Sequence, residues 1–185
     1  RELERQEPVQ GEDLQLTIDA RLQDIGFAAL KEETGSAVLM DVETGEVLML
    51  VSTPSFDPNL FNYPMSTSVW KSLNDELHRP QVNKAISEHY APGSTFKIVV
   101  ALAGLEAGVI EPDTQIHCDG KMYVGNHPFH CWKKTGHGSL NLKQALQHSC
   151  DVYFYEVARR VGADKIADMA ERSGFGSVSG IELNG

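Results

Sequence analysis

The sequence predicts an α+β domain in which antiparallel strands accompany a buried central helix that carries Ser94. Two strand-like runs at 36–42 and 46–52 are joined by a short loop that contains glycine, which is typical of a β-hairpin. The residues from 98 to 105 form an almost unbroken apolar run, which predicts a helix buried all round rather than along one stripe. A hairpin and a fully buried helix in one chain indicate the α+β class.

The first part of the chain divides into a linker, a strand and a helix before the hairpin begins. Residues 1–12 are charged and contain proline and glycine, so we expect a linker there. Apolar and polar residues alternate over 14–18, which predicts a half-buried strand. Asp19 is a favourable N-cap for a helix over 20–33, and a short surface helix is predicted over 66–76.

The part of the chain after the buried helix has two distinct compositions. Residues 111–139 are rich in glycine, histidine and cysteine, and we interpret them as an irregular excursion. Helices are then predicted over 140–149, 152–161 and 163–173, followed by a short strand over 181–183.

Composition and charge exclude some classes of partner. The chain has 185 residues and 41% hydrophobic content, enough for one domain with a sizeable core. Its formal net charge of -10 argues against nucleic acid or anionic lipid as the main partner. No apolar run approaches the ~18 residues of a membrane span.

Ser94 and Lys97 form the first candidate catalytic pair. They lie at the start of the predicted buried helix, three residues apart, so their side chains share one helix face. A lysine in apolar surroundings can act as the base that takes the proton of a serine hydroxyl. A second copy of the pattern, Ser68 and Lys71, lies in a polar segment where the lysine would be solvated and charged. We therefore assign the nucleophile to Ser94.

Three segments together resemble the penicillin-binding transpeptidase family. They are Tyr-Ala-Pro-Gly-Ser-Thr-Phe-Lys at 90–97, the triplet Ser-Cys-Asp at 149–151, and the run 51–59 that follows the hairpin. The resemblance extends from about residue 13 to the end. It is strongest to the class B enzymes of rod-shaped bacteria, which crosslink the elongating cell wall.

The resemblance implies a role for each of four residues. Ser94 would be the nucleophile that is acylated by stem peptides or by β-lactams, and Lys97 would be its general base. Ser149 would relay protons towards the leaving group, and Asp151 stands where the family often has asparagine. The backbone N–H of Ser94, near a helix start, suits one oxyanion donor.

The family's third motif, Lys-Thr-Gly, is expected on a strand well after the second motif. This chain has Lys134-Thr135-Gly136, but that copy precedes Ser149, so we interpret it as a coincidence and expect the true motif beyond Gly185. Residues 13–185 would then be the N-terminal portion of a transpeptidase domain. We expect this portion to be incomplete and inactive by itself.

The resemblance also implies a location and a partner. The protein would lie at the periplasmic face of the bacterial inner membrane, held by an N-terminal anchor that precedes this chain. Its partner would be a membrane glycan polymerase of the elongation machinery. No cofactor would be required for the chemistry itself.

Three cysteines fall within one part of the chain and indicate a structural zinc site. Cys118, Cys131 and Cys150 supply three thiolates, and an odd number fits poorly with a scheme of disulfides alone. We expect His137 as the fourth ligand because the glycines on both sides of it leave its backbone free to aim the ring. The alternative is a Cys118–Cys131 disulfide with a free Cys150.

Two other functions fit parts of the same pattern. A class D β-lactamase or a β-lactam sensor also carries Ser-Thr-Phe-Lys, although the charged Asp151 departs from their second motif. A non-catalytic interaction module held together by zinc would agree with the Cys/His cluster and with the lack of a third motif.

Overall fold

The computed structural model describes residues 9–181, which form two compact units, one ending at His89 and the other beginning at Tyr90. The predicted strand over 181–183 lies outside the described residues except for its first position, and so does most of the predicted linker at 1–12. Among the helices of the described part, none is long and apolar enough to span a membrane.

The first unit is built on the predicted β-hairpin. Strand β1 (Gly35–Met40) pairs antiparallel with strand β2 (Val47–Thr53). The Asp41 carboxylate accepts hydrogen bonds from the backbone N–H groups of Glu43 (2.8 Å) and Thr44 (2.9 Å). Local turn chemistry therefore closes the loop between the two strands.

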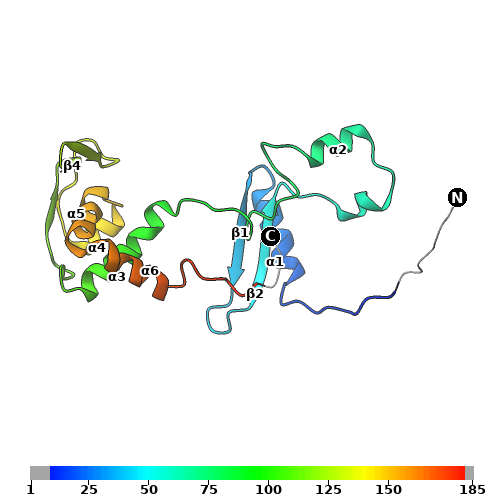
Figure 1. The fold of residues 1–185 in the computed structure, drawn as a ribbon, viewed down its shortest axis with the longest axis horizontal. Coiled ribbons are helices and arrows are strands. Elements are labelled where there is room, and N and C mark those ends of the chain that lie inside the picture. Colours follow the sequence, from blue (N-terminus) through cyan, green and yellow to red (C-terminus); the bar gives the residue numbers. More distant parts are fainter. Residues whose placement is uncertain (1–8, 182–185) are drawn as a thin grey trace. The chain divides into compact units, whose positions relative to one another are not determined.

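Helix α1 (Ala20–Leu30) packs against the hairpin (Figure 1). Asp19 is its N-cap, as predicted, and accepts hydrogen bonds from two N–H groups of the first turn at 2.8 and 3.2 Å. Gly26 is buried in the contact, where a Cβ would lie 2.4 Å from the Met49 sulfur. The small residue thus lets helix and strand approach closely.

Residues 14–18 do not form the predicted strand. Leu14 and Leu16 are exposed, although the segment runs beside β2, where the Thr17 hydroxyl donates to the Val47 carbonyl over 2.6 Å. Alternating polarity predicts a strand only if a neighbour covers the apolar face. Among the described residues no neighbour covers the two leucines, so the prediction was wrong.

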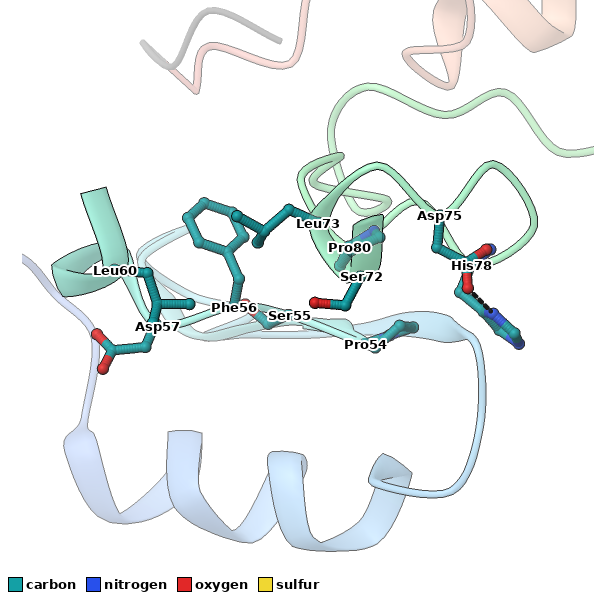
Figure 2. Close-up of a pocket in the computed structure, with 10 residues that line it drawn as sticks. All are labelled: Pro54, Ser55, Phe56, Asp57, Leu60, Ser72, Leu73, Asp75, His78 and Pro80. Atoms are coloured by element: carbon teal, nitrogen blue, oxygen red, sulfur yellow. Dashed lines mark hydrogen bonds and ion pairs between the residues drawn. The ribbon is translucent and has the colours of Figure 1, made fainter. Parts of the chain in front are cut away.

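The rest of the first unit surrounds an open cavity of about 570 Å³ (Figure 2). A 3-10 turn (Pro58–Asn62) and the short helix α2 (Thr67–Leu73) follow the hairpin, and α2 is the predicted surface helix. Phe56 and Leu73 line the cavity together, and His78 lies at its edge, where its Nδ1 is 3.0 Å from the Asp75 carboxylate.

The second unit begins with the segment that carries Ser94. A 3-10 turn, η2 (Gly93–Phe96), leads directly into helix α3 (Lys97–Glu106). Ser94 therefore lies in the turn before the helix rather than in the helix itself. The helix is not buried all round, because Ile98 is 58% exposed and Leu102 is 44% exposed. One side of α3 thus remains open within the second unit.

Helices α4 (Leu142–Gln147), α5 (Asp151–Val161) and α6 (Ala163–Arg172) follow the excursion, close to the predicted positions. Helix α3 packs against both α5 and α6 (Figure 1). Gly104 makes the α3–α5 contact close, since a Cβ there would lie 2.8 Å from a methyl group of Val157. Buried side chains of α3 and α5 form half of the core of this unit.

The predicted irregular excursion contains four short strands instead. Strand β3 (Ile116–Cys118) pairs with β6 (Gly138–Leu140), and β4 (Lys121–Val124) pairs with β5 (His127–His130), both antiparallel. Leu140 belongs to β6 and Asn141 caps α4, so that helix begins later than predicted. Strands of three or four residues leave too short a pattern to recognise in a sequence.

Lys134-Thr135-Gly136 lies at a turn rather than on a strand, as its interpretation as a coincidence requires. Gly136 has φ +77°, and a Cβ there would lie 2.1 Å from the Cys118 carbonyl oxygen. The absence of a side chain at Gly136 therefore allows two backbone segments to approach each other closely.

We expect Gly136→Ala to destabilise the protein more than Gly125→Ala. Both glycines have positive φ, a conformation that costs an alanine about 1–2 kcal/mol. A Cβ at Gly125 would meet nothing within 4 Å, whereas one at Gly136 would collide with backbone. Thermal unfolding of the two variants measures the difference, and equal shifts in melting temperature would contradict the expectation.

Candidate active site

Ser94, Lys97 and Ser149 form one chain of hydrogen bonds. The Ser149 hydroxyl lies 3.0 Å from the Ser94 hydroxyl and 3.0 Å from the Lys97 ammonium nitrogen. The backbone N–H of Lys97 donates to the Ser94 carbonyl, but among the described residues no hydrogen bond joins the two side chains directly. The pair identified from the sequence is therefore connected through Ser149.

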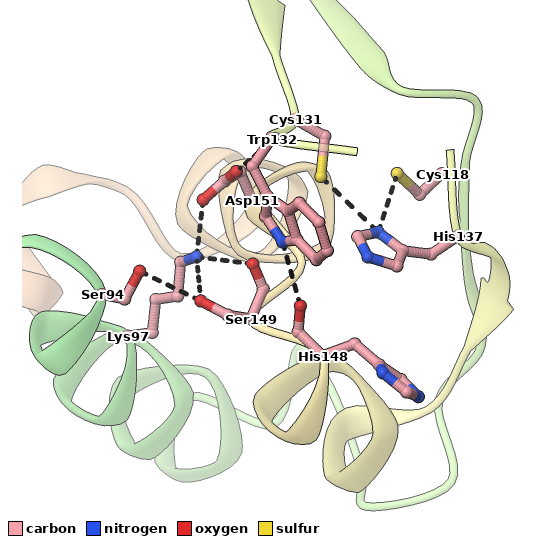
Figure 3. Close-up of polar contacts among 9 residues, drawn as sticks. All are labelled: Ser94, Lys97, Cys118, Cys131, Trp132, His137, His148, Ser149 and Asp151. Carbon is pink, nitrogen blue, oxygen red and sulfur yellow. Dashed lines mark hydrogen bonds and ion pairs between the residues drawn. The ribbon is translucent and has the colours of Figure 1, made fainter. Parts of the chain in front are cut away.

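Lys97 makes three short polar contacts (Figure 3). Its Nζ lies 2.9 Å from the Ser149 carbonyl oxygen, 3.0 Å from the Ser149 hydroxyl and 2.5 Å from Asp151 Oδ1. Three acceptors match the three N–H donors of an ammonium group. The side chains of Lys97 and Asp151 are only 13% and 21% exposed, so solvent screens their ion pair weakly.

Each carboxylate oxygen of Asp151 accepts a hydrogen bond. Oδ1 accepts from Lys97, and Oδ2 accepts from the backbone N–H of Trp132 at 2.9 Å. Burial raises the pKa of the Asp151 carboxyl, but the hydrogen bonds from Lys97 and Trp132 outweigh it, so the pKa lies below its ordinary value. Asp151 is thus a carboxylate, and it forms an ion pair with Lys97.

Ser149 occupies a position that usually belongs to glycine. It has φ +48° and ends helix α4, with its N–H bonded to the Leu146 carbonyl (3.1 Å) and the Cys150 N–H bonded to the Ala145 carbonyl (2.9 Å). These two bonds are the Schellman pattern of a helix C-terminus. A serine in this left-handed conformation costs about 1–2 kcal/mol relative to glycine. The hydroxyl at this strained position is the one that links Ser94 to Lys97.

Asp151 begins the next helix, α5, immediately after the junction between α4 and α5 that contains Ser149. Cys150 is the N-cap residue of α5 and Asp151 is its first helical residue. A negative charge in the first turn is stabilised by the helix dipole. The Asp151 carboxylate contacts Lys97, and the Ser149 hydroxyl contacts both Lys97 and Ser94.

A second group of side chains meets at Cys150, which also belongs to the junction between α4 and α5. One possible ligand atom from each of Cys118, Cys131, His137 and Cys150 lies within 4.8 Å of all the others. The four side chains are the ones selected from the sequence. All three thiols are free, so the structure does not adopt the disulfide alternative.

The geometry of this cluster fits a tetrahedral metal centre. His137 Nδ1 lies 3.7 Å from the Cys118 sulfur and 3.6 Å from the Cys131 sulfur. Zinc bonds of about 2.3 Å to sulfur and 2.0–2.1 Å to nitrogen at tetrahedral angles require an edge of about 3.6 Å. Burial lowers the pKa of the His137 imidazole, which favours the neutral form that binds metals. Nδ1 is the atom that faces the sulfurs, and Nε2 is buried without a hydrogen-bond partner among the described residues.

The glycines beside His137 behave as the sequence indicated. Gly136 and Gly138 have φ +77° and +73°, conformations that turn the chain so that the ring enters the cluster. His148 is near, with its ring centroid 6.0 Å from that of His137, but it points away from the sulfurs (Figure 3).

The second serine–lysine copy has the surroundings that were expected of it. Ser68 and Lys71 lie on α2 in the first unit, and both are exposed. The Ser68 hydroxyl lies 3.0 Å from that of Ser66, which is a surface contact. Within residues 9–181, only the Ser94 copy has a lysine that is bonded to a second serine and to a carboxylate.

Sequence reasoning missed the contribution of Trp132. Its backbone N–H holds Asp151, and its indole N–H donates to the His148 carbonyl over 3.1 Å. The available signal was its position directly after Cys131, which places it between the two groups of side chains. The residue type of Trp132, however, does not reveal this backbone contact, because every residue except proline has a backbone N–H donor.

The amino-acid sequence of this chain is similar to those of known proteins. A family model described as the penicillin binding protein transpeptidase domain matches residues 35–185. The peptidoglycan D,D-transpeptidase MrdA of Acinetobacter baumannii is 40% identical over 185 residues, covering 99% of this chain and 28% of that protein. MrdA of Escherichia coli K12 is 38% identical, covering 99% of this chain and 29% of that protein. The chain thus spans less than a third of the length of these relatives.

Solved structures show the same likeness in three dimensions. Pseudomonas aeruginosa PBP2 in complex with WCK 5153 has a TM-score of 0.82 and 40% identity, over 94% of this chain and 38% of that chain. PBP2 of Helicobacter pylori in complex with MreC has a TM-score of 0.81 and 36% identity, over 86% of this chain and 30% of that chain. The predicted fold class is confirmed.

Proposed function

The chain belongs to the penicillin-binding protein transpeptidase family, and we propose that it is the N-terminal part of the transpeptidase domain, residues 13–185, of a penicillin-binding protein 2. The whole protein would be a peptidoglycan D,D-transpeptidase that crosslinks stem peptides through a serine ester and is acylated by β-lactams. The observation that carries this proposal is the hydrogen-bonded chain from Ser94 through Ser149 to Lys97 and Asp151.

The proposed acylation begins from Lys97 as an ammonium group. It donates to the Asp151 carboxylate and to two oxygens of Ser149, and it can act as a base once one of its protons has left. The neutral amine then takes the hydroxyl proton of Ser149 as Ser149 takes that of Ser94. Lys97 thus remains the base predicted from the sequence, but it acts on the nucleophile through Ser149.

The Ser94 oxygen then attacks the carbonyl carbon of the penultimate D-alanine. The peptide bond to the terminal D-alanine breaks, and its nitrogen receives a proton back through Ser149. An amine of a second stem peptide next attacks the ester, which forms the crosslink and restores the Ser94 hydroxyl. The Ser94 N–H would be one oxyanion donor, and a third motif beyond Gly185 would bring the other.

We propose that the cluster of three cysteines and His137 binds one structural zinc ion. Four protein ligands leave no open coordination position, so the ion would take no part in the reaction. Cys150 lies between Ser149 and Asp151 in the chain, and Cys131 precedes the residue whose N–H holds Asp151. The ion would therefore hold both catalytic side chains in place.

We infer the location and partners from the family. The protein would lie at the periplasmic face of the inner membrane and work with a membrane glycan polymerase. The Helicobacter pylori PBP2 is solved in complex with MreC, and that relative supports a place for this protein in a larger assembly. Such an assembly would bring the polymerase and the transpeptidase to the same strand of cell wall.

Ser94→Ala in the full-length protein should abolish covalent labelling by a fluorescent penicillin, because the ester oxygen is lost. Ser68→Ala is the matched control and should label like the parent, since Ser68 is exposed on α2. Labelling is measured on denaturing gels. Persistence of the label in Ser94→Ala would remove Ser94 as the nucleophile.

Lys97→Arg should lower the acylation rate by about 10²–10⁴-fold, because guanidinium stays protonated and cannot accept a proton. Lys71→Arg, on exposed α2, should leave the rate unchanged. Stopped-flow acylation with a chromogenic cephalosporin measures both variants. A Lys97→Arg enzyme with the parent's rate would exclude Lys97 as the base.

Elemental analysis should find about one zinc per chain. Removing the ion with a chelator should lower the melting temperature by at least about 5 °C, since metal binding and folding are coupled. His137→Ala should lose the metal, whereas His148→Ala should keep it, because His148 points away from the sulfurs. Purified protein without metal, and with unchanged melting behaviour in the chelator, would contradict the site.

A further inference from the structure

A group of basic side chains surrounds one open cavity of the second unit. The cavity has a volume of about 660 Å³ and is lined by Asp119, Gly120, Lys121, His130, Cys131 and Lys134. From residue 114 to residue 150 the chain has four lysines and a single acid, Asp119. The chain as a whole has a net charge of -10, so this segment is opposite in sign to the protein that contains it.

Close backbone contacts bring the basic residues of the lining together. Lys121 on β4 is paired with His130 on β5, which places both side chains on the same face of the hairpin. Gly120 has φ +93°, and a Cβ there would lie 2.1 Å from the Lys134 carbonyl oxygen. The Cys131 N–H donates to the Gly120 carbonyl at 2.9 Å. The backbone of the lining is therefore close-packed, which fixes where its basic side chains begin.

Lys121 and Lys134 are available to a ligand. Among the ion pairs of residues 9–181, none includes either lysine, whereas Asp119 already has a neighbour, with its Oδ1 2.9 Å from His117 Nε2. The Lys121 ammonium nitrogen lies 5.3 Å from the centroid of the Tyr123 ring, which is 56% exposed. The cavity thus offers an anionic ligand two cations with an aromatic ring beside them.

We propose that this cavity is a second binding site for the cell-wall strand, and that it takes a free carboxylate of a stem peptide other than the one that reacts with Ser94. The proposal rests on the function proposed above. Two lysines beside one acid suit a single carboxylate better than a dense polyanion, and the net charge of the chain repels polyanions. A strand with several stem peptides is long enough for both contacts, whereas penicillin is small and needs only the Ser94 site.

The cavity is close in the chain to the catalytic side chains. Cys131 lines it, and the next residue, Trp132, donates its backbone N–H to the Asp151 carboxylate at 2.9 Å. The cavity and Ser94 also belong to the same compact unit. Binding energy from a contact away from the reacting bond can be used to position that bond. The second site would therefore favour crosslinking of strands without being required for acylation by β-lactams.

The test measures binding of a muropeptide, a disaccharide with its stem peptide, to full-length protein whose Ser94 has been acylated by penicillin. The acyl group blocks the nucleophile, so calorimetric titration reports binding elsewhere. Changing Lys121→Glu and Lys134→Glu together should weaken this binding by at least about fivefold, because two attractive charges become repulsive. Lys143→Glu is the matched control and should bind like the parent, since Lys143 is exposed on α4 and outside the lining.

A muropeptide whose carboxylates have been converted to carboxamides tests the chemistry of recognition. It should bind the parent at least about fivefold more weakly than the acid form does, and it should not distinguish the parent from the double variant. Added salt should weaken binding of the acid form to the parent. Equal binding of the two muropeptides, or parent-like binding by the double variant, would overturn the proposal. Binding of phosphatidylglycerol vesicles without binding of the muropeptide would also overturn it.

Further measurements separate this inference from misfolding and from the proposed function. Lys121→Gln and Lys134→Gln remove the charges without reversing them, so each should weaken binding less than the double reversal, and melting temperatures show whether every variant folds. Penicillin acylation tests the proposed function by itself. If the protein is not acylated, that function fails, and titration of the untreated protein with both muropeptides still decides whether the cavity binds a carboxylate.

Discussion

The contact between Lys97 and the junction of α4 and α5 is the interaction on which the candidate site depends. One ammonium group binds the Ser149 carbonyl, the Ser149 hydroxyl and the Asp151 carboxylate, all within 3.0 Å. A largely buried charge is tolerated only with such partners, because an unpaired one would cost several kcal/mol. Lys97 therefore fixes where α3 and the junction meet, and this places the hydroxyl of Ser149 against that of Ser94.

The backbone at the α4–α5 junction is strained at Ser149, and other parts of the second unit hold it in this conformation. Ser149 adopts a left-handed conformation that glycine would adopt at no steric cost. Its neighbours on both sides are anchored: α4 ends in a Schellman pattern, and Cys150 enters the cysteine cluster. The strain is thus located at the residue whose hydroxyl links nucleophile and base, which is where strained residues are commonly found in enzymes.

Some elements could be predicted because their causes are local. Asp19 caps α1 through bonds to the next turn, and Asp41 closes the hairpin through N–H groups two and three residues away. The predicted strand at 14–18 was wrong because alternation does not supply a partner for Leu14 and Leu16. The strands of the excursion were missed because each has three or four residues and depends on pairing across the chain.

The sequence by itself determined which side chains are available: a serine and a lysine one helical turn apart, a second serine beside an acid, and three cysteines with a histidine between glycines. Residue type and spacing carry that information because they set chemistry and local reach. Only the tertiary structure decided that Ser149 stands between Ser94 and Lys97, and that a backbone N–H of Trp132 holds Asp151. Both depend on how distant segments pack, and contacts more than fifty residues apart, such as that between Lys97 and Asp151, leave no local pattern to read.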